Sequence, residues 1–307
     1  LLPSLLAPTV GGYVIDYLDW HWIFVGQLPF ALIATVLLYP HLKPLARSPV
    51  AGSESSRRAV LQALRVAIGA GILVTVLAQP VDWTWLVLIP LAILIFWAPF
   101  VAVMPAGFVT ARRGLAAAVM LHFLIFFAFY AAEMFMPRML IEMRGVSSSV
   151  TGLAFTCCAI AWIGASFFQA WLSGRVSVYQ SLLWGMLLTS IGLLLTATPL
   201  HPATPNWFVF VAWGVAGIGM GIAYNTVVTA TKNCTPEGKE GATSTANGMA
   251  SALSVGLAAG IGGAITNQSE FSGSGLADAL AIIWMMAGAA CVLSIIIVLA
   301  RFRAEPD

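Results

Sequence analysis

Long apolar runs alternate with short polar segments along the whole chain, and this alternation dominates the sequence. A helix needs about 20 mainly apolar residues to cross a bilayer. The apolar runs therefore predict ten membrane-spanning helices, the first of them incomplete because the chain begins inside its apolar run. We place these helices near residues 1–15, 20–39, 60–79, 83–104, 114–137, 150–172, 180–199, 207–230, 242–265 and 278–300.

The composition agrees with a membrane protein. Of the 307 residues, 60% are hydrophobic and only 8% are charged, whereas soluble domains average about 25% charged residues. We therefore expect an all-α, polytopic helix bundle that is solvated by the lipid bilayer. The net charge of +2 is small, and we expect no nucleic-acid partner. The four cysteines lack CxxC spacing, so we expect no disulfide framework, no metal site and no cofactor.

The lysines and arginines fall on alternate loops, which predicts the orientation of the chain. Only Arg138 and Arg144 lie on one set of loops, and the other twelve of the 14 basic residues lie on or beside the other set. Basic loops face the cytoplasm. The C-terminus is therefore expected to be cytoplasmic, and the loops at 16–20, 138–147 and 200–206 are expected to face outward.

A long polar stretch divides the chain into two unequal parts. Residues 40–59 are rich in Pro, Ser and Arg and predict a flexible cytoplasmic linker. Six predicted spans after residue 113 suggest an internal duplication whose first half is mostly absent. The expected domains are 1–39, the last two spans of an N-terminal bundle; 60–104, an inserted helix pair; and 105–307, a six-span C-terminal bundle with a short cytoplasmic tail.

One predicted span carries both an acid and a histidine. Glu133 lies toward the outer end of segment 114–137, and His122 lies eleven residues earlier, about 20° away around the helix and roughly 16 Å along it. Charges at membrane depth are costly and usually functional. We expect Glu133 and His122 to carry protons or to contact substrate charge. The expected cavity-lining residues, whose aromatic members suit a flat lipophilic cation, are Phe126, Phe129, Tyr130 and Asn225.

Structural interpretations of the same residues stay open at this stage. Glu133 lies near the interface, where a carboxylate reaches water or pairs with Arg138 or Arg144. His122 is equally interpretable as a hydrogen-bonded packing residue, and Asn225 as a polar link between helices.

Small residues recur at helical spacing in two later spans. Five of them, four residues apart, form a ridge over Gly248–Ala264, and such a ridge predicts close helix packing. The GxGxG pattern at 217–221 lies inside a predicted span without the strand and loop of a dinucleotide-binding fold. We therefore interpret it as a packing feature and not as a nucleotide site.

Helix breakers interrupt the first apolar run. "APTVGG" at 7–12 is followed by the aromatic stretch "DWHWIFVGQLPF" at 19–30. Together they resemble the antiporter signature of the major facilitator superfamily, Gly-Pro-x-x-Gly-Gly at the end of the fifth span and Trp-Arg-Trp-x-Phe before the sixth. Ala7 stands for the first glycine and His21 for the arginine. The residues that match the family pattern are Pro8, Gly11, Gly12, Trp20, Trp22, Phe24 and Pro29.

The two spans after the linker resemble the fourteen-span drug:proton antiporters of that superfamily. The resemblance implies a chain truncated at its N-terminus, with about ten spans present. It also implies a monomer in the bacterial inner membrane that exports small lipophilic or cationic compounds in exchange for protons by alternating access. In the family, the signature implies a tight contact between the two halves that seals the outer side.

Other functions compete with export. An intramembrane enzyme is disfavoured because the spans hold no HExxH, no GxSxG and no paired acids, so we expect a protein that is not an enzyme. An uncoupled facilitator, or a transporter of another small solute on the same fold, remains an alternative. So does an inactive fragment, because the missing spans would supply half of the family's pathway.

Overall fold

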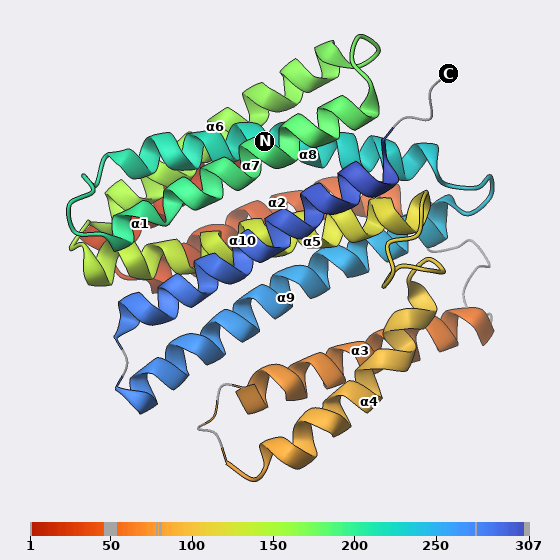
Figure 1. The fold of residues 1–307 in the computed structure, drawn as a ribbon, viewed down its shortest axis with the longest axis horizontal. Coiled ribbons are helices and arrows are strands. Elements are labelled where there is room, and N and C mark those ends of the chain that lie inside the picture. The colour runs from red at the N-terminus through yellow and green to blue at the C-terminus, as the bar shows by residue number, and fades with distance from the viewer. Residues whose placement is uncertain (1, 46–53, 78, 80–81, 274, 304–307) are drawn as a thin grey trace.

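The computed structural model describes residues 2–45, 54–77, 79, 82–273 and 275–303. Within them the chain forms ten α-helices, a π-helical segment, one 3₁₀ turn and no β-strand (Figure 1). The elements are α1 Leu2–Tyr17, α2 His21–Leu45, α3 Glu54–Leu77, α4 Trp85–Val103, α5 Leu115–Pro137, η1 Arg138–Met143, α6 Ser148–Leu172, α7 Val178–Thr196, η2 Thr198–Leu200, α8 Phe208–Asn233, α9 Glu240–Ser272 and α10 Leu276–Arg301.

The all-α prediction is confirmed, and each predicted segment corresponds to one α-helix. Eight helices of the described part are long and apolar enough to cross a membrane. Of the ten predicted segments, the two that form α1 and α3 do not reach this measure within the described residues, and the first of them is expected to be incomplete. Helix α1 has only 16 described residues, and α3 opens on the charged sequence ESSRR, which leaves Leu64–Leu77 as its apolar part.

The predicted linker is more helical than expected. Helix α2 continues to Leu45 and α3 begins at Glu54, so both ends of the 40–59 stretch are helical, and residues 46–53 lie outside the described residues. Beyond the linker, α3 and α4 pair with each other and lie beside α9, at the edge of the bundle (Figure 1).

Helix α5 is the central element of the six-helix bundle α5–α10. It packs against α7, α8, α9 and α10 and is apolar around most of its circumference. Side chains such as Ala117, Leu121 and Ala131 are fully buried. A helix that is hydrophobic on all sides is expected to lie inside a bundle. Its position places the polar groups of α5 among neighbouring helices.

The glycines of α8 bring three helices into close contact, as the packing interpretation predicts. A Cβ at Gly217 or Gly221 would meet backbone atoms of α6, and one at Gly219 would meet the backbone of α7. Small residues allow helix backbones to approach in this way. Helix α8 therefore lies between α6 and α7, with its backbone in close contact with the backbones of both helices.

The ridge on α9 behaves differently from the prediction. Of the three glycines in the ridge, Gly260 makes a close approach to the side chain of Val74 on α3, while a Cβ at Gly248 or Gly256 would meet open space. A cavity of about 490 Å³ lies between α3 and α9. The spacing of four along α9 thus predicts close helix packing correctly at Gly260 and wrongly at Gly248 and Gly256.

Candidate functional site

A cavity of about 630 Å³ lies among α1, α5, α6 and α8. Its walls are mostly aromatic or aliphatic, with one carboxylate and one side-chain amide. The lining residues are Pro8, Phe129, Glu133, Phe155, Cys158, Ala159, Trp162, Ile163, Ser166, Phe167, Ala170, Trp213, Tyr224 and Asn225. This volume suits a small organic molecule, since ligand pockets of about 300–1,000 Å³ are typical.

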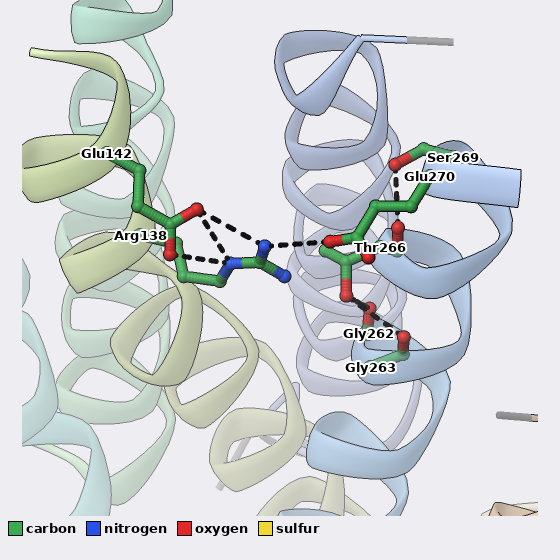
Figure 2. Close-up of polar contacts among 7 residues, drawn as sticks. All are labelled: Arg138, Glu142, Gly262, Gly263, Thr266, Ser269 and Glu270. Carbon is green, nitrogen blue, oxygen red and sulfur yellow. Dashed lines mark hydrogen bonds and ion pairs between the residues drawn. The ribbon is translucent and has the colours of Figure 1, made fainter. Parts of the chain in front are cut away.

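Glu133 is the acidic group of this cavity. Its Oε2 atom is buried and has no hydrogen-bond partner among the described residues. The two nearby arginines are engaged elsewhere. Arg138 lies between Glu142 at 3.0 Å and Glu270 of α9 at 3.1 Å (Figure 2), and Arg144 Nε donates to Asn206 Oδ1 at 2.9 Å. The alternative in which Glu133 pairs with Arg138 or Arg144 is therefore wrong.

Aromatic rings form the wall beside Glu133. Phe129, one helical turn from the carboxylate, stacks on Trp213 with ring centroids 4.9 Å apart. Trp162 meets Phe129 edge to face at 5.4 Å. Tyr224 extends the group to 5.9 Å from Trp162. The faces of such rings attract cations, so the carboxylate and the rings can act on the same positively charged guest.

Two further polar groups border the cavity. Asn225 is half-buried, and its Nδ2 donates to the carbonyl of Gly221 at 3.0 Å on its own helix, which leaves its carbonyl oxygen as an acceptor. The indole N–H of the fully buried Trp213 has no partner within the described part of the chain. Within that part, no three His, Cys, Asp or Glu side chains are placed to hold a metal ion.

His122 does not share the cavity with Glu133, contrary to our expectation. It is buried at 4% exposure, stacks on Phe126 at 4.6 Å and makes a 2.6 Å hydrogen bond between Nε2 and Ser251 Oγ of α9. The physical reason is distance, because roughly 16 Å along the helix axis separates the two side chains. Glu133 thus lines the cavity, while His122 bonds α9 and lies beside the cavity residue Tyr224, with ring centroids 5.8 Å apart.

Phe126 and Tyr130 also lie outside the cavity lining. Phe126 contacts the cavity residue Tyr224, with ring centroids 5.5 Å apart, and Tyr130 contacts Phe126 at the same distance. Of the four residues predicted to line the cavity, Phe129 and Asn225 do so, together with Glu133, the predicted charge-bearing residue. Trp162, Trp213 and Tyr224 were not among our predictions, since an aromatic residue in an apolar span carries no local sign of which cavity it faces.

The breakers of α1 pack against α6. The carbonyl of Pro8 lies where a Cβ at Gly152 would stand, and the carbonyl of Ser148 lies where a Cβ at Gly12 would stand. Thr9 and Thr156 join their hydroxyls at 2.7 Å. The two helix backbones are therefore in direct contact, and this contact forms one edge of the cavity because Pro8 also lines it.

The other residues of the signature take no part in that contact. A Cβ at Gly11 would meet open space. Trp20 and Trp22 are 55% and 57% exposed, and Pro29 is exposed on α2. Three residues of α6 complete the contact, Ser148, Gly152 and Thr156. They are spaced by four, and this small-residue pattern could have revealed the face of α6 that meets α1.

Comparisons with known proteins agree with this architecture. The family model for the Major Facilitator Superfamily matches residues 118–307. The chain is 24% identical over 248 residues to "Multidrug resistance protein Stp" of Mycobacterium tuberculosis, covering 76% of the chain and 44% of that protein. It is 24% identical over 235 residues to "Multidrug transporter protein MdtP" of Bacillus subtilis, covering 72% and 42%.

A third relative covers more of the chain. "Methylenomycin A resistance protein" of Bacillus subtilis is 27% identical over 314 aligned residues, covering 96% of the chain and 64% of that protein. The chain spans about half the length of the curated relatives it matches.

Proposed function

We propose, since the chain belongs to the major facilitator superfamily, that the protein is a secondary active transporter that exports small lipophilic or cationic compounds in exchange for protons. The observation that carries the proposal is the unpartnered carboxylate oxygen of Glu133 in an aromatic cavity. The names of the relatives, multidrug and methylenomycin resistance proteins, support export of small compounds.

The chemistry of Glu133 suggests how exchange is enforced. An ionised carboxylate in an apolar cavity is costly unless a counter-charge reaches it. A proton and a cationic substrate each neutralise the carboxylate, and one group holds only one of them at a time. Binding of the substrate then requires loss of the proton, and the return of a proton expels the substrate.

Alternating access requires that the cavity open to one side at a time. We propose that the α1–α6 contact closes the outer side in the conformation described here. The bacterial relatives and the basic loops support a multi-pass protein of the bacterial inner membrane with its C-terminus in the cytoplasm. His122 is then a link between α5 and α9 rather than a coupling group.

The direct test is efflux from cells that express the protein. Cells are loaded with ethidium, a fluorescent lipophilic cation, and efflux is followed with and without a protonophore. Loss of efflux on uncoupling supports proton exchange. Efflux that persists after uncoupling supports the uncoupled facilitator. Absence of ethidium efflux under either condition contradicts export of this lipophilic cation.

Trp162→Ala is expected to weaken substrate binding without unfolding the protein. Trp162 is half-buried, and its ring borders the cavity, so its loss removes aromatic surface from the guest. The ethidium concentration at half-maximal transport should rise about threefold to tenfold. Trp184→Ala is the matched control, because Trp184 is 62% exposed on α7 and does not line the cavity. Equal effects of the two substitutions would contradict the assignment of Trp162.

A further inference from the structure

Asp16, at the end of α1, binds the first turn of α6. Its Oδ1 accepts a hydrogen bond from the backbone N–H of Ser148 at 3.1 Å, and its Oδ2 accepts one from that of Ser149 at 2.7 Å. The first four N–H groups of a helix have no partner within the helix. A residue 132 positions earlier in the chain therefore satisfies two of them.

The remaining cap of α6 is local and weak. Ser147, the N-cap residue, accepts from the N–H of Val150 at 3.4 Å. A typical N-cap side chain satisfies one orphan donor, so the carboxylate of α1 supplies most of the capping here. The positive end of the α6 dipole also favours a negative charge at this place.

The position of Asp16 follows from the α1–α6 contact. Pro8, Gly12 and Asp16 are spaced by four and share one face of α1. Pro8 and Gly12 meet Gly152 and Ser148 of α6 backbone to backbone. The two helices run antiparallel. Asp16, one turn after Gly12 on α1, therefore lies beside the N-terminus of α6.

We propose that Asp16 is a positioning residue that holds the outer side of the cavity closed by capping α6 from α1. The inference rests on the proposed alternating access. When α1 and α6 separate, two N–H groups lose a charged acceptor and regain only water, which is a weaker arrangement than a charge-assisted hydrogen bond. The ionised carboxylate thus favours the closed conformation specifically.

No other charged group of the described residues competes for Asp16. On its own helix, Tyr13 and Tyr17 stack on each other at 5.9 Å. Asp19 bonds with His21 at the start of α2, and Arg144, before α6, is bound to Asn206 and loop carbonyls. The hydrogen bonds from Ser149 and then Ser148 hold the pKa of the Asp16 carboxyl below its ordinary value.

The sign of the pH effect follows from this shift. A carboxyl with a lowered pKa in the closed state stabilises that state fully above its ordinary pKa, and the effect is lost as the pH falls from that value through the lowered pKa. The ordinary value is 3.8, so near neutral pH the carboxylate remains charged in both states. Asp16→Asn therefore tests the proposal better than acidification does.

The test measures access to the cavity without any substrate. Cys158 lines the cavity and is 4% exposed. In the full-length protein, the other three cysteines of this chain are replaced by alanine, and Cys158 is labelled from outside the cell with a membrane-impermeant maleimide. Asp16→Asn should raise the labelling rate roughly threefold to tenfold. Asp19→Asn, a nearby acid bonded only to its neighbour His21, should leave it unchanged.

A second variant separates capping from other effects of Asp16. Ser148→Pro removes one of the two N–H groups and keeps Asp16. Proline is tolerated at the first helical position, and the extended backbone of Ser147, φ −65° and ψ 156°, suits a residue before proline. The effect of Asp16→Asn should fall by about half or more in the Ser148→Pro background, since one of its two hydrogen bonds is already absent.

Unchanged labelling in Asp16→Asn would overturn the proposal, as would an equal rise in Asp19→Asn or full additivity with Ser148→Pro. These outcomes are separate from failure of the proposed export. A protein that exports no ethidium still reports on the α1–α6 contact through Cys158, and a protein with unchanged labelling still reports on proton exchange through efflux.

Discussion

Glu133→Gln is expected to eliminate uncoupler-sensitive efflux of ethidium. Glutamine keeps the size and hydrogen-bonding ability of the side chain, but it neither releases a proton nor neutralises a cation. Removing one partner of a buried charge pair costs about 2 kcal/mol or more, which corresponds to a loss of roughly 30-fold or more in apparent affinity. Dye efflux from cells, corrected for the amount of protein in the membrane, measures this loss.

The matched comparison is His122→Gln on the same helix. Both residues are ionisable side chains of α5, but only Glu133 borders the cavity, while His122 bonds to Ser251. Export should survive in His122→Gln and remain sensitive to the protonophore. Unchanged export in Glu133→Gln would make the carboxylate structural, and loss of coupling in His122→Gln alone would move the coupling site to the α5–α9 contact.

The sequence predicts the helices well because lipid imposes one simple requirement on them. A spanning segment must be apolar over about 20 residues and must satisfy its backbone internally. The same requirement explains smaller features of individual helices. The charged start of α3 shortens its apolar part to Leu64–Leu77, and Ser177 with Gln180 forms a capping box where α7 begins.

The cavity is less predictable, because four helices build it and spacing along one helix says nothing of the others. Glu133 and His122 lie near one face of α5, yet Glu133 lines the cavity, whereas His122 bonds Ser251 of α9 and contacts Tyr224 of α8 from outside the cavity lining. In the same way, the breakers Pro8 and Gly12 are visible in the sequence, but their contact with Gly152 and the acceptor role of Asp16 join α1 to α6, which lies 132 positions further along the chain where Asp16 meets Ser148. When two helix backbones touch in this way, the only trace of the contact within each helix is a row of small residues spaced by four.

Gly219→Ala is expected to destabilise the protein, although alanine is the better helix former. A Cβ at Gly219 would lie 2.6 Å from the carbonyl carbon of Leu188 and equally close to Thr189 Oγ1 of α7. Thr189 is buried at 1% exposure, so the neighbouring backbone has no space into which to move. Overpacking of this kind costs about 1–3 kcal/mol. Thermal unfolding of the purified full-length protein in detergent should begin several degrees lower.

Gly214→Ala supplies the control with the opposite sign. This glycine lies on the same helix, but the nearest atom to its added Cβ is Cys157 Sγ at 3.8 Å, an ordinary van der Waals contact. Alanine there gains helix propensity of up to about 1 kcal/mol with no collision, so the unfolding temperature should hold or rise. Both substitutions replace glycine by alanine on α8. The two sites differ in the distance from the added Cβ to the neighbouring helix, and this distance accounts for the opposite expected shifts. Equal shifts would mean that α7 and α8 are not held at the separation seen here.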